Sequence, residues 1–180
     1  MERSSMEHHS EGQTANQVLV EIQPNLGLDA NSRSAIIELL NVALSDEILL
    51  ATKTRSLHWN VRGITFFGLH ALFDAQYQQL CRISDEMAER VRMLGGVASG
   101  SLRGYLDQAR LVEQPEDPPD VLRLLADHES VIRFLREDGK RCMDEYEDEG
   151  TRDLLISTMR AHEKMAWMLR SSIEMENGRS

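Results

Sequence analysis

Five potential metal ligands occur with helical spacing between residues 57 and 96. They are His58, the pair His70 and Asp74 four residues apart, and the pair Asp85 and Glu89 with the same spacing. Residues four apart lie on neighbouring turns of one helix face, so each pair can present two ligands to one metal ion. Imidazole nitrogen and carboxylate oxygen with open positions suit iron(II) better than structural zinc, which prefers closed Cys and His sets.

One long amphipathic helix is expected to carry the two pairs. No Pro or Gly occurs between His70 and Leu94, and apolar residues recur there at helical spacing. Eleven residues separate Asp74 from Asp85, which is ~16 Å along the axis, so the pairs cannot share a metal within one helix. A second copy of the helix, packed antiparallel across a two-fold axis, would bring the unlike ends together and build two equivalent sites.

The same stripe has a simpler interpretation. A polar stripe on an amphipathic helix is more often a solvated face, and a His beside an apolar surface is more often structural. Periodicity alone therefore leaves the metal site as the less common alternative.

The motifs HWNVRG, LHALFD and DEMAERVRMLGG resemble, in order and spacing, the signature of the Dps family, the miniferritins. The resemblance extends from about Asn31 to Glu176, and the family's motif positions are unsubstituted here: His58, His70, Asp74, Asp85 and Glu89. It implies an all-α, ferritin-like four-helix bundle, with a short extra helix in the connection between the second and third long helices.

The resemblance also implies a function, namely iron storage and detoxification by a ferroxidase. Iron(II) would be oxidised with hydrogen peroxide, or more slowly with oxygen, and stored as iron(III) mineral inside a hollow homo-dodecamer, which protects the cell from oxidative damage. His58, His70 and Asp74 would come from one subunit, and Asp85 and Glu89 from the partner subunit.

Capping and breaking residues predict the element boundaries. We expect a flexible tail over residues 1–30, the bundle over 31–176 and a short tail over 177–180. Four long helices and one short helix are predicted: one starting at Asn31 or Ser32 and ending before Gly63, one ending after Leu94, a short one at Ser101–Leu111, one at Asp120–Asp148 closed by Gly150, and one capped by Thr151. A helix start near Pro119 fits the preference of Pro for the first turn.

Several single residues carry separate predictions. Trp59 is expected to pack in the core, with shielding of the metal or radical trapping as the alternative. His128 is expected to have a surface or structural role, and Leu122 to face inward with Leu125, Ile132 and Leu135. His162 has no Glu three residues before it, and no Glu-x-x-His occurs in the chain, which argues against a di-iron centre within one subunit.

An acidic run surrounds the end of the third long helix. It comprises Asp144, Glu145, Glu147, Asp148, Glu149 and Asp153. Such clusters are commonly just solvated. By resemblance, however, this turn borders a three-fold pore that draws in iron(II), and Asp148, Glu149 and Asp153 are best placed to line it.

Composition and charge limit the partners. The formal net charge of −10 opposes non-specific binding to nucleic acid or anionic membranes. Residues 1–17 contain the single basic side chain Arg3, and neither tail has a Lys or Arg cluster, so DNA binding is doubtful. The alternative function is a nucleoid-associated, DNA-binding structural protein with little turnover, and a shell that binds iron or zinc without turnover also stays open.

No apolar run is long enough to span a bilayer and no signal-peptide core is seen near Met1, so a cytoplasmic location is expected. The two cysteines, Cys81 and Cys142, imply no disulfide framework and are expected to be reduced. The adjacent His8 and His9 in the N-terminal tail could hold a metal, but are more often incidental.

Overall fold

The structure is a computed structural model that describes residues 23–114 and 120–177. These residues contain five helices and no strand. They are α1 (Ala30–Asn60), α2 (Phe66–Met93), α3 (Leu102–Gln108), α4 (Val121–Asp144) and α5 (Glu149–Asn177). The all-α prediction is confirmed, including the short helix between the second and third long ones. The predicted tails fall largely on residues 1–22 and 178–180, which lie outside the described residues, as does Pro119.

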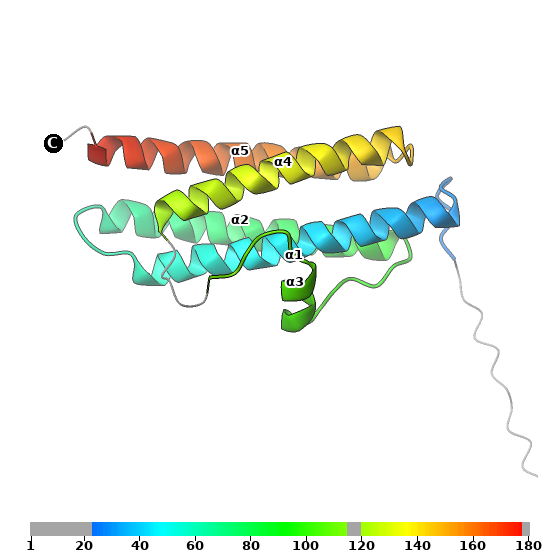
Figure 1. The fold of residues 1–180 in the computed structure, drawn as a ribbon, viewed down its shortest axis with the longest axis horizontal. Helices are drawn as coiled ribbons and strands as arrows, with labels where there is room; N and C mark the ends of the chain where they lie inside the picture. The colour runs from blue at the N-terminus through cyan, green and yellow to red at the C-terminus, as the bar shows by residue number, and fades with distance from the viewer. Residues whose placement is uncertain (1–22, 115–119, 178–180) are drawn as a thin grey trace, which may run out of the picture.

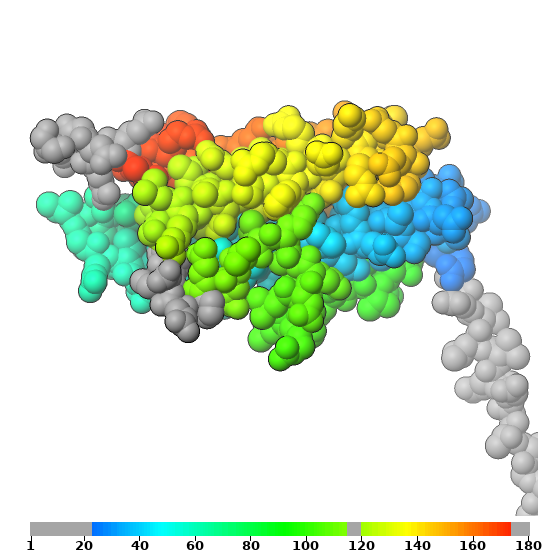
Figure 2. Space-filling model, viewed as in Figure 1, coloured from blue at the N-terminus to red at the C-terminus, as the bar shows by residue number. Residues whose placement is uncertain are grey.

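The bundle consists of two antiparallel helix pairs, α1 with α2 and α4 with α5 (Figure 1). Helix α3 lies against α1, and the segment that contains it crosses the face formed by α1 and α4 (Figure 2). Asn41 ties this segment to α1, because its side chain donates to the Val97 carbonyl at 3.1 Å and accepts from the Ser99 amide at 2.8 Å.

Large apolar side chains from all four long helices fill the centre. Among those almost fully buried are Ile36, Leu40, Leu44, Leu50, Phe73, Leu80, Met87, Leu124, Leu135, Leu155 and Met165. Burying side chains of this kind removes roughly 1.5–3 kcal/mol each of unfavourable hydration, so this core is the main source of stability.

Two helix ends differ from prediction, namely the start of α1 and the end of α4. Asp29, not Asn31 or Ser32, caps α1, since its carboxylate accepts from the amides of both at 2.8 and 3.1 Å. Gly150 does not close α4, which already ends at Asp144; Gly150 and Thr151 lie within the first turn of α5. The chain reverses at Glu147 instead, where φ is 53°.

The prediction that Leu122 faces the core is wrong. Its side chain is 63% exposed, while Leu124 and Val131 occupy the buried positions of α4 beside Leu135. The apolar residues near Leu122 come in adjacent pairs, Val121 with Leu122 and Leu124 with Leu125, so the sequence pattern does not say which of them faces inward.

A candidate metal centre on α1 and α2

His58 and His70 are brought together by the tight connection between α1 and α2. Helix α1 ends at Asn60, and Gly63, with φ of 100°, lets the chain turn back so that α2 begins at Phe66. The last turn of α1 therefore faces the first turns of α2, where His70 lies. The sequence prediction that His58 delivers a nitrogen to the His70 end agrees with this arrangement.

The two imidazoles contact one another directly. Their ring centroids are 3.9 Å apart with an interplanar angle of 36°, and the Phe66 ring lies 5.1 Å from that of His70. His58 Nδ1 lies 3.0 Å from the backbone carbonyl oxygen of His70. Because a carbonyl only accepts, Nδ1 carries the hydrogen, which leaves the Nε2 lone pair of His58 available to a metal ion.

Asp74 lies one turn beyond His70 and is oriented by a neighbour. Gln78 Nε2 donates to Asp74 Oδ2 at 2.9 Å, which leaves Oδ1 open. His58, His70 and Asp74 are all half-buried, so their side chains are positioned by the protein but can be reached from outside.

Asp85 and Glu89 lie further along α2 and are both exposed. The described residues contain no group of three or more His, Cys, Asp or Glu side chains placed to hold a metal. The structure thus brings His58 next to His70 with Asp74 on the following turn, but it does not bring Asp85 and Glu89 to them within one chain.

Trp59 does not pack in the core as predicted. Its side chain is 68% exposed, with the Arg55 guanidinium 5.2 Å from the ring centroid. The same guanidinium lies 5.3 Å from the ring of Tyr77 and donates to its hydroxyl at 3.3 Å. A basic side chain between two oxidisable rings therefore flanks the candidate centre.

The acidic run contains two kinds of carboxylate. Glu149 and Asp153 are exposed, as a pore role would need. Asp148 is 5% exposed and accepts from Arg90 at 3.0 and 3.1 Å and from Thr151, so its carboxylate joins the α4–α5 turn to α2. Asp148 is therefore too buried and too fully bonded to line a pore.

Sequence reasoning missed that Glu47, His128 and His162 are ionisable residues of the interior, all 0% exposed. Of the two roles expected for His128, surface or structural, the surface role is wrong. A signal for Glu47 existed, because it occupies a position of the α1 apolar stripe, between Leu44 and Leu50, at helical spacing. Cys142 is also buried, and burial, aided by the carboxylates of Asp148 and Asp138, raises the pKa of its thiol to about 12, so it stays protonated.

None of the helices in the described residues combines the length and hydropathy needed to cross a membrane.

Comparison with known proteins identifies the family. The ferritin-like domain model matches residues 37–177. An uncharacterized low temperature-induced protein of Nostoc sp. is 46% identical over 154 residues, covering 83% of this chain and 86% of that protein. The DNA protection during starvation protein 2 of Bacillus anthracis is 33% identical over 139 residues, covering 76% of this chain and 94% of the relative.

A solved structure agrees. The Dps protein from Vibrio cholerae O1, described as a member of a broad superfamily of ferritin-like diiron-carboxylate proteins, superposes with a TM-score of 0.77 at 30% identity, covering 84% of this chain and 98% of that one. With the fold, the histidine pair and these matches in agreement, the chain belongs to the Dps family of ferritin-like proteins.

Proposed function

We propose that this protein is a ferroxidase that stores iron in a hollow dodecamer and thereby limits oxidative damage. Membership of the Dps family supports iron storage or DNA protection in general. The observation that carries the more specific proposal is the contact between His58 and His70, with the Nε2 lone pair of His58 free, at one end of an exposed acidic stripe.

Each site would be shared between two subunits. Asp85 and Glu89 lie ~16 Å or more along α2 from Asp74 and close to the same helix face. They are exposed and so accessible to a second copy of the helix. Antiparallel packing about a two-fold axis would bring His58, His70 and Asp74 of one subunit to Asp85 and Glu89 of the partner subunit, twice per dimer.

An apolar groove near the same end of the bundle supports assembly. It has a volume of about 810 Å³ and its lining includes Ile64, Leu72, Val121, Trp167 and Met168. Ile64, which lines it, is 97% exposed and the nearby Phe67 is 85% exposed, and the α1–α2 loop projects from the left end of the molecule in Figure 2. Exposed apolar patches of this kind mark protein contacts, so we assign this end to contacts between subunits.

The proposed ligand set suits iron as a substrate. Two neutral imidazoles and three carboxylates favour iron(III) over iron(II), because the carboxylates interact more strongly with the higher charge. Two iron(II) ions supply the two electrons that reduce one hydrogen peroxide, with two protons, to two waters, so no hydroxyl radical is released. Oxygen would serve as the slower oxidant, and the exposed Glu149 and Asp153 would draw iron(II) toward the shell.

The test is the growth of iron(III) absorbance after iron(II) and hydrogen peroxide are added to the purified protein. Asp85→Ala/Glu89→Ala is expected to lower the initial rate at least about tenfold while leaving the helical circular dichroism signal unchanged. The matched control, Glu38→Ala/Glu137→Ala, removes two exposed carboxylates away from the stripe and should oxidise iron(II) as the wild type does. An unchanged rate in the first variant would refute the ligand assignment.

A further inference from the structure

Three ionisable side chains form a buried chain across the interior of the bundle. Glu47 comes from α1, His162 from α5 and His128 from α4, and all three are 0% exposed. His162 Nε2 lies 2.9 Å from Glu47 Oε1, and His162 Nδ1 lies 2.9 Å from His128 Nδ1. We call these three residues the core relay; they are separate from the candidate metal centre on α1 and α2.

The geometry of the core relay suits protons rather than a metal ion. His162 is in the middle and presents a different nitrogen to each neighbour, so the donor atoms do not converge on one point. Two nitrogens 2.9 Å apart share a single hydrogen, because two N–H groups directed at each other would repel. His128 and His162 therefore cannot both be imidazolium while this contact is intact.

The core relay also has unsatisfied ends. Glu47 Oε2 and His128 Nε2 are buried and have no hydrogen-bond partner among the described residues. A buried charge without a partner is unfavourable, so a positive charge added at His128 is strongly disfavoured in the folded bundle. Burial, together with the charge of His162, holds the pKa of His128 well below its usual value.

The charged groups around the core relay are already paired. Lys53 of α1 and Asp127 of α4 contact each other at 2.7 Å. Arg110 binds Asp46 of α1 at 2.8 Å and Asp138 of α4 at 2.7 Å.

The remaining buried polar groups on the neighbouring helices cannot supply a counter-charge. The buried polar residues of α2 are Gln76 and Ser84, which do not titrate, and those of α5 other than His162 are Thr151 and Thr158. Cys142 of α4 stays a neutral thiol, since its pKa is raised to about 12.

We propose that the core relay is a pH-sensitive latch that holds the α4–α5 pair against α1 at neutral pH and releases it on acidification. In an opened or unfolded chain both histidines take up protons near their ordinary pKa of about 6.5. The closed bundle has room for at most one of these protons, because His128 and His162 cannot both be imidazolium while their Nδ1 atoms are 2.9 Å apart. Below about pH 6.5 the open state therefore binds one more proton, and the opening equilibrium rises about tenfold per pH unit.

The architecture makes this joint the place where opening would occur. Helix α1 packs along α2, and α4 along α5, whereas contacts between the two pairs are fewer (Figure 1). Polar links cross between the pairs at several places: the Glu47–His162 contact of the core relay, the Lys53–Asp127 ion pair, the hydrogen bond from Gln76 to the Met165 carbonyl at 3.2 Å, and the bonds from Arg90 to Thr151 and Asp148. Losing the contact between Glu47 and His162 weakens this joint more than it weakens either helix pair.

The experiment is hydrogen–deuterium exchange with mass spectrometry on the intact, full-length assembly at pH values on both sides of about 6.5. Rates are corrected for the intrinsic pH dependence of amide exchange. In the wild type, the opening of α4 and α5 peptides is expected to rise about tenfold per pH unit below that value. In His128→Asn, which keeps a hydrogen-bonding group facing His162 but cannot take up a proton, the opening should not change with pH.

Asp127→Asn is the matched control, because it removes the neighbouring ion pair without removing a histidine. It should raise the opening by the same factor at every pH and so preserve the slope. The proposal would be overturned if opening of the wild type did not change with pH, or if opening of His128→Asn changed with pH as steeply as that of the wild type.

If His128→Asn does not fold, His128→Gln and the wild type itself keep the proposal testable. Solid-state nitrogen NMR of the wild type with labelled histidine distinguishes neutral imidazole from imidazolium. The chain contains six histidines, and we expect at least one to stay neutral at a pH about one unit below the ordinary histidine value, while the protein is still folded. Six imidazolium signals from folded protein at that pH would exclude the latch.

Discussion

The imidazole of His58 lies against that of His70 with 3.9 Å between ring centroids, and its Nδ1 donates to the His70 carbonyl oxygen at 3.0 Å. One hydrogen bond thus fixes both the tautomer and the orientation of the first proposed ligand relative to the second. It joins the end of α1 to the start of α2, so the local fold of the turn and the chemistry of the site depend on each other.

Removing the His58 imidazole should weaken iron(II) binding. We expect His58→Ala to lower the affinity at least about a hundredfold, because losing a direct ligand costs a metal site no less than losing an outer-shell partner. Anaerobic calorimetric titration with iron(II) measures this. Trp59→Phe, which changes the exposed neighbouring ring, should bind as the wild type does; equal affinities for His58→Ala and the wild type would contradict the assignment.

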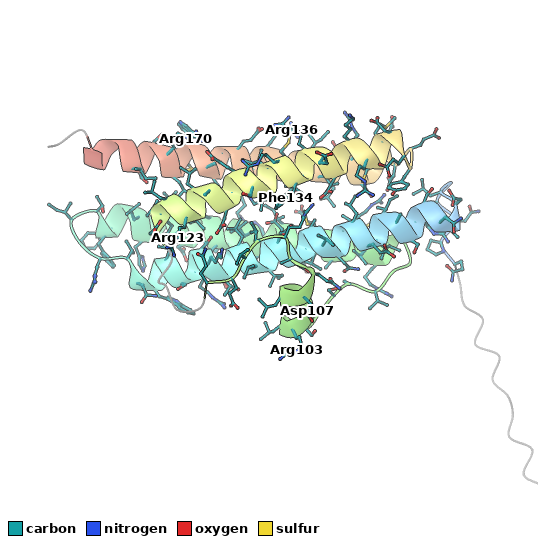
Figure 3. The ribbon with its side chains drawn as sticks, in the orientation of Figure 1. Arg103, Asp107, Arg123, Phe134, Arg136 and Arg170 are labelled. Carbon is teal, nitrogen blue, oxygen red and sulfur yellow. The ribbon has the colours of Figure 1, made fainter. Side chains whose placement is uncertain are left out.

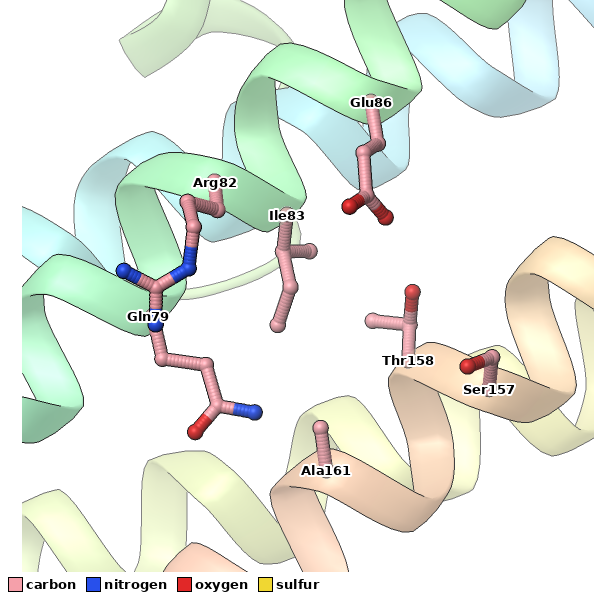
Figure 4. A pocket seen from close by; sticks show the side chains of 7 residues that line it. All are labelled: Gln79, Arg82, Ile83, Glu86, Ser157, Thr158 and Ala161. Carbon is pink, nitrogen blue, oxygen red and sulfur yellow. The ribbon is translucent and has the colours of Figure 1, made fainter.

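Gln78 should matter because it orients Asp74. Its Nε2 donates to Asp74 Oδ2 at 2.9 Å, so we expect Gln78→Ala to lower iron(II) affinity about tenfold, as measured by the same titration. Gln79→Ala is the control, since Gln79 lines a separate small cavity between α2 and α5 (Figure 4). If only Gln79→Ala lost iron(II) affinity, Gln79 and not Gln78 would be the glutamine that supports the metal site.

Asp148 should be a stability residue. It is 5% exposed and bound by Arg90 and Thr151, so Asp148→Asn is expected to cost about 2–3 kcal/mol of unfolding free energy in urea. The exposed ion pair between Arg136 of α4, labelled in Figure 3, and Glu163 of α5 offers the control, because Glu163→Gln should change stability by less than about 1 kcal/mol.

The Asp148 carboxylate also predicts how the stability of the fold changes at acidic pH. Burial alone would raise the pKa of Asp148, but hydrogen bonds from Thr151 and the charge of Arg90 outweigh it, so the pKa is lowered overall. A carboxyl whose pKa is lower in the folded than in the unfolded chain stabilises the fold at pH values above its unfolded-state pKa of about 3.9. This stabilisation is lost as the pH falls below that unfolded-state pKa. Urea midpoints between about pH 5 and 3 should fall more steeply for the wild type than for Asp148→Asn; parallel curves would contradict this.

The apolar end of the bundle should control assembly. Phe67→Asp places a charge on a side chain that is 85% exposed in the single chain, and we expect the assembly to dissociate while the helices persist. Light scattering after size exclusion measures the mass, and circular dichroism measures the helix content. The conservative Phe67→Leu should assemble as the wild type does, and an intact Phe67→Asp assembly would place the subunit contact elsewhere.

DNA binding should be absent at moderate salt. The formal net charge of −10 repels phosphates, and neither tail carries a basic cluster that could offset it. Gel shifts with the purified protein test this, and a complex that persists at physiological salt would favour the nucleoid-protein alternative.

The sequence predicted the helices, and the placement of both residue pairs on one helix, because these follow from local spacing. The i, i+4 pairs on α2 and the breaks near Gly63 and Gly95 depend only on neighbours along the chain. The core relay could not be predicted, because Glu47, His128 and His162 are far apart in sequence and meet only when the helix pairs pack. The exposure of Leu122 and Trp59 likewise depends on which residue of an apolar cluster faces the partner helix, and periodicity does not decide that.

The most direct test of shared sites mixes two inactive variants. His58→Ala/His70→Ala loses one half of every site, and Asp85→Ala/Glu89→Ala loses the other. If each site takes its two halves from different subunits, unfolding and refolding an equal mixture should restore about a quarter of the wild-type iron(II) oxidation, since that fraction of random pairings is complete. No recovery from a mixture that reassembles fully would contradict the sharing of sites between subunits.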